Sequence, residues 1–299
     1  MLNLSLFTVS FAGLWGQHRL SLEDSIRKTS DLGYQGVEIM GKRPHLSPLD
    51  YSVEDCDVLR DQLDSQGLKV SAVAAYTNFT GGMDSPEVPF PDLQIAYIEA
   101  LAERTARLGG DLIRIFTSYE RADIPFASQW QATVGAIRQC ADRAADHGVT
   151  IGIQNHHDIG VATKALQELL SDVDRPNVTP MYDLWSVYLM GEDVVAGTRA
   201  MGPRMRFTTV ADYVTIPRAH YKGELVNYTP VNPPYVQAVP MGQGELPYDL
   251  FFKTLLDTGF DGWISYEMCC PVRGGGAIEN IEQYAHRFIQ YMRALEADR

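Results

Sequence analysis

The chain has 299 residues, of which 45% are hydrophobic and 21% are charged, and this length suits one large domain or two small ones. Its formal net charge of −13 argues against nucleic acid as a partner, because an acidic surface repels phosphate backbones. No apolar run approaches the roughly 20 residues that cross a membrane, and the four cysteines form no CxxC pair, so we expect a cytoplasmic protein with reduced thiols.

A helical stretch that ends at a glycine and leads into an apolar strand recurs along the chain. Glycine takes the left-handed conformation that ends many helices, so each copy predicts a helix followed by a strand. The first and last copies share the pattern Asp-x-Gly-aromatic-x-Gly, which suggests an internal repeat. The copies lie at residues 31–40, 64–76, 108–116, 146–155 and 257–267.

Eight strands are predicted in chain order, beginning with the alternating apolar residues of the N-terminal segment. They lie near residues 2–10, 35–40, 69–76, 111–116, 150–155, 178–184, 206–211 and 262–268. Segments with apolar residues spaced three and four apart predict helices between them. These segments are 21–33, 52–67, 91–110, 127–148, 164–173, 192–202, 246–259 and 280–296.

Strands that alternate with helices predict a parallel sheet of the α/β class, and eight such units predict a single (β/α)8 TIM barrel over residues 1–299. An open doubly wound sheet fits less well. No GxGxxG-like turn follows the first strand, and no change in composition marks a second domain.

The carboxyl ends of the strands in such barrels carry the active site, and polar side chains occupy these ends in the predicted strands. We assign catalytic roles to Glu267 and His156, since a carboxylate and an imidazole can both move protons. The side chains assigned to substrate binding are Glu38, Arg114, His157, Trp185, Asp212 and His220. Structural alternatives stay open: Glu38 could bond a neighbouring strand, Arg114 could pair with Glu38, and the histidines could donate to loop carbonyls.

Residues 213–243 form a segment that is too long for an idle loop in a compact barrel. Because it follows the seventh strand, it starts on the catalytic face. We expect a lid over the active site, with a dimer contact as the alternative. Its basic residues Arg218, His220 and Lys222 could hold a carboxylate or phosphate of the substrate.

Four stretches together resemble the xylose isomerase-like TIM barrels: 33–39, 148–156, 181–186 and 239–268. That family includes sugar isomerases and epimerases, inosose dehydratase and the endonuclease IV branch. The resemblance implies one divalent metal, Mn²⁺ or Mg²⁺, held by Glu, Asp, His and Glu on strands five to eight. The matching positions here are Gln154, Asp183, Thr209 and Glu267.

Two of these four positions depart from the family pattern. The carbonyl oxygen of Gln154 can still coordinate a hard cation, so we expect a metal site of Gln154, Asp183 and Glu267 with one further group, Asp212 or His156. An amide cannot accept a proton. The substitution therefore favours chemistry with one base over epimerisation with two.

The first hypothesis is a metal-assisted isomerase, or with less support an epimerase, that acts on a small keto or aldo sugar or sugar acid through an enediolate. The second is a lyase, a dehydratase or decarboxylase, that acts on an oxidised sugar through the same enolate. The third is a sugar-binding barrel without activity whose metal site has decayed. A homo-oligomer is expected by analogy with other barrels, and the DNA-repair branch fits least, since the chain has only seven histidines.

Overall fold

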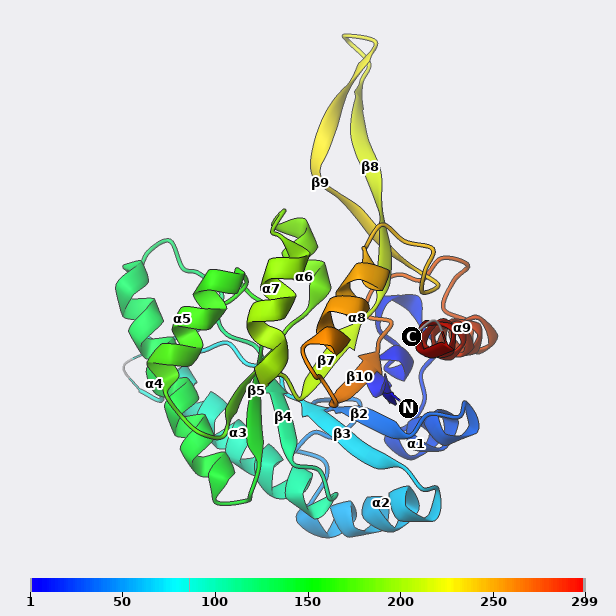
Figure 1. The fold of residues 1–299 in the computed structure, drawn as a ribbon. Coiled ribbons are helices and arrows are strands. Elements are labelled where there is room, and N and C mark those ends of the chain that lie inside the picture. Colours follow the sequence, from blue (N-terminus) through cyan, green and yellow to red (C-terminus); the bar gives the residue numbers. More distant parts are fainter. Residues whose placement is uncertain (1, 86, 298–299) are drawn as a thin grey trace.

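The computed structural model describes residues 2–85 and 87–297, in which eight parallel strands curl into a nearly closed barrel (Figure 1). The strand order is β6-β5-β4-β3-β2-β1-β10-β7. Each predicted strand overlaps an observed one, so the expected TIM barrel is confirmed. The strands are β1 (Asn3–Phe7), β2 (Gly36–Met40), β3 (Lys69–Ala74), β4 (Leu112–Ile115), β5 (Thr150–Gln154), β6 (Val178–Met181), β7 (Phe207–Val210) and β10 (Trp263–Tyr266).

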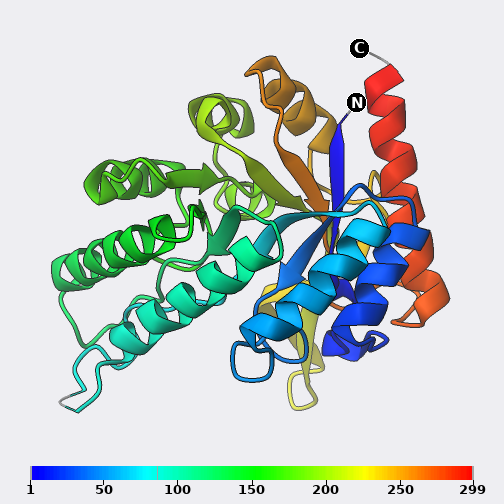
Figure 2. The ribbon, with the colours of Figure 1, turned by 90° about the horizontal axis from the view of Figure 1, so that it is seen from below.

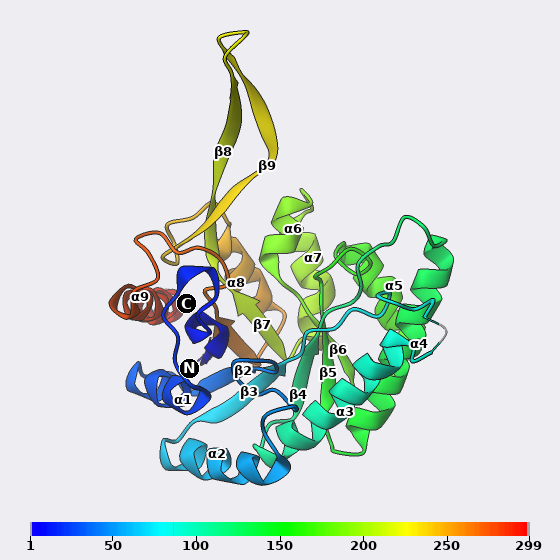
Figure 3. The ribbon, with the colours of Figure 1, turned by 180° about the vertical axis from the view of Figure 1, so that it is seen from behind.

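Helices lie around the outside of the strands, as Figures 2 and 3 show from two further sides. Serine caps begin the first two, since the Ser21 and Ser52 side chains accept the backbone N–H of Asp24 and Asp55. The helices are α1 (Leu22–Asp31), α2 (Val53–Ser65), α3 (Phe90–Arg107), α4 (Phe126–Ala145), α5 (Thr163–Val173), α6 (Leu184–Leu189), α7 (Val194–Met201), α8 (Tyr248–Asp257) and α9 (Ile278–Ala297).

The short helix α6 was not predicted. The sequence predicts a strand over 178–184, but β6 ends at Met181 and Asp183 caps the helix that follows. The Asp183 carboxylate accepts the N–H of Trp185 over 2.8 Å, which turns the chain into a helix directly after the strand.

The glycines that the first and last copies of the repeated pattern share have matching physical roles. Gly33 and Gly259 follow α1 and α8 with φ of +86° and +84°, which glycine adopts without strain. A Cβ on Gly36 would lie 2.5 Å from the Trp263 ring, and one on Gly262 would lie 2.1 Å from the carbonyl oxygen of Arg206. Both positions therefore need glycine for close packing beside the strands that flank β1.

The barrel has one seam. β6 and β7 lie at opposite ends of the strand order, and among the described residues no ladder joins them. The hydroxyl of Thr208 on β7 instead donates to the carbonyl of Tyr182 over 2.8 Å.

The segment 213–243 is largely a β-hairpin rather than a loop. β8 (Asp212–Lys222) pairs antiparallel with β9 (Asn227–Val239), and the ribbon projects from the rest of the molecule (Figure 1). The sequence did not indicate strands here because five prolines interrupt the segment, and proline is rare inside sheets. A two-stranded ribbon tolerates it since each strand has a free edge.

In the described part of the chain, none of the helices combines the length and apolar content that a membrane span requires. The four cysteines are all free thiols.

Candidate active site

Three carboxylates, two buried and the half-buried Glu267, lie toward the carboxyl ends of barrel strands. Glu38 is in β2, Asp183 follows β6, and Glu267 follows β10, where its N–H donates to the Val210 carbonyl. Glu38 is fully buried and Asp183 is 7% exposed. Residues that lie far apart in the chain thus meet at one rim of the barrel, as the fold requires.

Burial raises the pKa of all three carboxyls. Burial, together with the charges of Glu38 and Asp183, raises the pKa of Glu267 to about 8. Burial raises the pKa of Glu38 to about 7 and that of Asp183 to about 6, while Arg114 opposes both shifts. Glu267 is therefore the member of the group that most readily holds a proton at neutral pH.

Arg114 on β4 supplies a buried positive charge to this group. Its side chain is 3% exposed, its Nε lies 3.9 Å from Oε1 of Glu38, and its Nη1 donates to the Ala75 carbonyl over 3.1 Å. The guanidinium lies 4.1 Å from the centre of the Phe116 ring and 5.2 Å from that of Tyr76. Arg114 thus pairs with Glu38, which was the structural alternative for this residue, and its Nε has no hydrogen-bond partner among the described groups.

Gln154 at the end of β5 lies against Asp183. Its Nε2 donates to Oδ2 of Asp183 over 3.2 Å, and its Oε1 is buried without a hydrogen-bond partner in the described residues. Asn155, which we did not assign to the site, holds the same loop, because its Nδ2 donates to the Asp183 carbonyl over 2.9 Å. The position of Asn155 directly after the fifth strand could have identified it as a residue of the site.

The two histidines after β5 are close to each other and to aromatic rings. Nδ1 of His156 lies 2.7 Å from Nδ1 of His157, and Phe116 lies 4.5 Å and 4.4 Å from the two rings. Burial and the charge of Arg114 lower the pKa of His156 to about 4, and burial with the charges of His156 and Arg114 lowers that of His157 to about 3. Both imidazoles are neutral at pH 7, so His156 is a weak base in this setting.

Asp212 and His220 are not brought to the carboxylate group. Oδ2 of Asp212 accepts the N–H groups of Gly242 and Gly244 over 2.9 Å and 2.8 Å, so this side chain fastens the base of the hairpin. His220 pairs with Thr229 on the outer part of the hairpin, where it is exposed. These positions could not be predicted, because the sequence does not identify the hairpin that begins at Asp212.

Trp185 is half-buried at the start of α6 and packs on Tyr213, with ring centres 4.6 Å apart. Lys42 is a cation that the sequence analysis missed. Its Nζ lies 3.6 Å from the centre of the Tyr76 ring, which also faces Arg114, and burial together with the Arg114 charge lowers its pKa. Two cations thus lie near the ring of Tyr76, and Lys42 could have been noticed as the second residue after the second strand.

A model of the xylose isomerase-like TIM barrel family matches residues 26–295 of the chain. The protein belongs to this family. Fructoselysine 3-epimerase of Shigella flexneri is 19% identical over 258 residues, which cover 85% of this chain and 87% of the relative. Inosose dehydratase of Mesomycoplasma hyopneumoniae is 22% identical over 290 residues, which cover 92% and 89%. The solved structure of D-allulose 3-epimerase from Methylomonas sp. aligns with a TM-score of 0.74 at 16% identity over 98% of both chains.

This xylose isomerase-like barrel departs from the ligand set that the resemblance implies. The hydroxyl of Thr209 points to Oε2 of Glu38 at 3.5 Å. Within residues 2–85 and 87–297, no three His, Cys, Asp or Glu side chains converge as a metal site would require. A cation would therefore depend on the amide of Gln154.

The oxygens of Gln154, Asp183 and Glu267 nevertheless suit a hard cation. Oε1 of Gln154 is buried without a partner among the described groups, and the charges of the neighbouring carboxylates raise the pKa of Glu267. A divalent cation would satisfy the oxygen and relieve the repulsion, and oxygen ligands are those that Mg²⁺ and Mn²⁺ prefer.

Proposed function

We propose that this protein is an isomerase that moves a proton at the carbon next to a carbonyl of a keto or aldo sugar or sugar acid. The observation that supports this most directly is the group of Glu38, Asp183 and Glu267, in which Glu38 lies 3.9 Å from the guanidinium of Arg114. It combines a proton-holding carboxyl with a positive charge that can stabilise an enediolate. The names of the relatives, sugar epimerases and dehydratases, are consistent with chemistry at such a carbon.

In the proposed reaction Glu267, in its ionised form, takes the proton from the carbon next to the carbonyl. The electron pair of that C–H bond forms the carbon–carbon double bond, and the carbonyl electron pair moves to oxygen. Glu267 then returns the proton to the neighbouring carbon, while the hydroxyl proton of the enediolate crosses to the other oxygen. Arg114 would donate to the oxygen that gains negative charge, since its Nε has no other partner among the described groups.

Gln154 decides between isomerisation and epimerisation in this proposal. Epimerisation with two bases needs a proton acceptor on each face of the substrate carbon, and an amide cannot accept a proton. His156 does not replace it well, since burial lowers its pKa to about 4. One base suffices for a proton transfer between adjacent carbons.

We further propose Mn²⁺ or Mg²⁺ as the cofactor, held by Gln154, Asp183 and Glu267. When bound, such an ion polarises the carbonyl and the adjacent hydroxyl of the substrate. Glu38 and Arg114 would remain outside this set and bind the substrate. The ligand is a small molecule in this proposal, and the four free thiols suit a cytoplasmic location.

A second candidate is a lyase that expels water from the same enolate. The alignment with inosose dehydratase over 92% of this chain favours it. The first step is identical, and only the fate of the electron pair differs, because it leaves with a hydroxyl group on the next carbon.

Incubation with a panel of keto sugars in D₂O, with and without Mn²⁺, tests these alternatives. An isomerase incorporates one deuterium and leaves the sugar otherwise unchanged in mass, and a dehydratase gives a product that lacks one water. Incorporation on both faces of one carbon would show epimerisation and would contradict the role of Gln154. Sugar binding without any exchange would favour the non-catalytic hypothesis.

A further inference from the structure

The outer part of the hairpin, residues 217–234, has two chemically different faces; we call it the arm. Cross-strand pairs of an antiparallel ribbon share a face. The pairs Tyr221–Tyr228 and Ala219–Pro230 form an apolar face, on which the two tyrosine rings lie 5.2 Å apart. Tyr221 is 57% exposed and Tyr228 is 65% exposed.

The opposite face of the arm is basic. Arg218, His220 and Lys222 alternate along β8 and lie opposite Val231, Thr229 and Asn227 on β9. The acidic residue of the arm, Glu224, lies in the turn at the tip. The chain as a whole has a net charge of −13, whereas the basic residues of the arm outnumber its acidic ones.

The base of the hairpin is held in a fixed direction. Besides the Asp212 contacts, the Ala238 N–H donates to the Pro271 carbonyl, and the Thr215 N–H donates to Oε1 of Glu245 over 3.0 Å. The arm projects away from the barrel (Figure 1), so bending it back onto its own active-site mouth would break these hydrogen bonds.

The edges of the arm are poorly suited to adding another strand. Pro217 lies in β8, and Pro230, Pro233 and Pro234 lie in β9. Proline has no N–H to donate, and it protects exposed edges from pairing. An isolated two-stranded ribbon is marginally stable in water, so we expect the arm to be covered through its side chains.

An acidic surface of complementary chemistry lies on the loops that follow strands β3, β4 and β5 and helix α6; we call it the rim. It consists of the loops 77–85 and 87–89 after β3, 117–125 after β4, 155–162 after β5 and 190–193 after α6. These loops carry one arginine, Arg121, and seven acidic residues: Asp84, Glu87, Glu120, Asp123, Asp158, Glu192 and Asp193.

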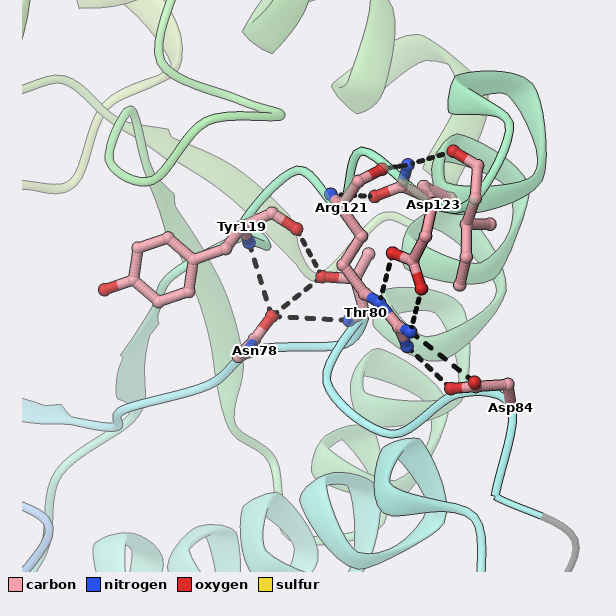
Figure 4. Close-up of polar contacts among 8 residues, drawn as sticks. Asn78, Thr80, Asp84, Tyr119, Arg121 and Asp123 are labelled. Atoms are coloured by element: carbon pink, nitrogen blue, oxygen red, sulfur yellow. Dashed lines mark hydrogen bonds and ion pairs between the residues drawn. The ribbon is translucent and has the colours of Figure 1, made fainter.

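Hydrogen bonds between its loops order part of the rim (Figure 4). Arg121 forms ion pairs with Asp84 and Asp123, and Oδ1 of Asn78 accepts the hydroxyl of Thr80 over 2.9 Å and the N–H of Tyr119 over 3.3 Å. Arg121 is thereby neutralised. Within the described ranges, no ion pair reaches Glu87, Glu120, Asp158, Glu192 or Asp193.

The rim also exposes apolar side chains beside its charges. Tyr119 is 50% exposed and Met190 is 52% exposed. Tyr119 stacks on His157 with ring centres 4.0 Å apart, so this part of the rim adjoins the predicted site. The rim thus has acidic groups that could pair with the basic face of the arm and apolar groups that could pack on its tyrosines.

We propose that the arm of one copy of this chain docks on the rim of a second copy, and that the second copy's arm docks in return. Such an arrangement closes under a twofold axis and forms the same contact twice. It places Arg218, His220 and Lys222 beside the mouth of the partner's barrel. This proposal does not depend on which reaction the site performs.

Sedimentation velocity of the full chain over a range of concentrations tests the proposal. We expect a dimer that dissociates as salt is added, because the contact pairs exposed charges. Reversal of two arm charges, Arg218→Glu with Lys222→Glu, should raise the dissociation constant at least 10-fold. The matched control is Lys69→Glu with Lys253→Glu, which makes the same change in charge at exposed positions outside the arm and should leave the dimer intact.

A compensating change then identifies the partner surface. Glu87→Arg with Glu120→Arg on the rim should restore dimerisation when combined with the reversed arm. A photo-crosslinking residue in place of Tyr228 should yield a product of twice the chain mass. A monomeric wild type, a dimer that the arm reversal leaves unchanged, or crosslinks formed solely within one chain would each overturn the proposal, and the last result would establish a lid.

Discussion

At the scale of single residues, the site depends on how burial changes the proton affinity of its side chains. The sequence indicates Glu38, Asp183 and Glu267 correctly as neighbours because the carboxyl ends of parallel barrel strands must meet. It does not give their pKa order, which depends on desolvation and on Arg114. Glu267, with a pKa raised to about 8, is therefore the residue whose replacement is most informative.

Glu267→Gln keeps the shape of the side chain and removes its ability to accept a proton. We expect deuterium incorporation into the keto sugar that serves as substrate to fall by about 10²–10⁴-fold, the usual contribution of a general base. Mass spectrometry of the recovered sugar measures it. Glu54→Gln, the same change on the exposed face of α2, should have no effect, and an unchanged rate in Glu267→Gln would remove Glu267 from the mechanism.

Gln154→Glu tests the metal site with a readout other than activity. A new carboxylate would take the place of an amide whose Nε2 lies 3.2 Å from Asp183, so repulsion should destabilise the protein without metal by about 1–2 kcal/mol. Bound Mn²⁺ should reverse the loss. Thermal unfolding with EDTA and with Mn²⁺ measures both effects. A melting temperature of the variant that does not change when Mn²⁺ is added would contradict the assigned ligands.

At the scale of elements, the hydrophobic pattern predicted all eight barrel strands, because a buried parallel strand leaves a continuous apolar run. The hairpin and α6 escaped prediction for a different reason. Prolines obscure β8 and β9, and α6 depends on a cap at Asp183 that looks like part of a strand. Asp212 and His220 were consequently assigned to substrate binding, although the hairpin uses the first at its base and presents the second to solvent.

Asp212→Ala should loosen the hairpin and leave the barrel folded. The change removes the acceptor of the Gly242 and Gly244 N–H groups, and each of these partly exposed hydrogen bonds contributes about 1 kcal/mol. Hydrogen exchange followed by mass spectrometry should show faster exchange in residues 212–239 and unchanged exchange in β1 to β5. Asp61→Ala on exposed α2 is the control. Equal protection of the hairpin in both variants would show that its base is held by other contacts.

At the scale of the whole molecule, the buried carboxyls link stability to pH. Glu267 and Glu38 have pKa values raised to about 8 and about 7, so the folded state keeps protons that the unfolded chain releases near its ordinary pKa of 4.5. Their contribution to stability is complete below pH 4.5 and is lost as pH rises through 7 and 8. His156 and His157, whose pKa values are lowered, act in the opposite sense, but only below about pH 6.5.

The free energy of unfolding in EDTA should therefore fall by roughly 2 kcal/mol between pH 7 and pH 9. Urea titrations at several pH values measure it. Glu267→Gln cannot ionise and should flatten this dependence, whereas Glu54→Gln should reproduce the wild-type slope. A stability that rises between pH 7 and pH 9 would show that these carboxyls are not buried as a group.

The seam between β6 and β7 has a consequence for the range of ligands the protein can accept. The sheet is a ring that is open between β6 and β7. The Thr208 hydroxyl crosses this opening and donates to the carbonyl of Tyr182, the residue before Asp183. A wider gap between β6 and β7 would carry Asp183 away from Glu267 without breaking any backbone hydrogen bond between paired strands. A barrel built this way can match the distance between Asp183 and Glu267 to the width of the bound ligand.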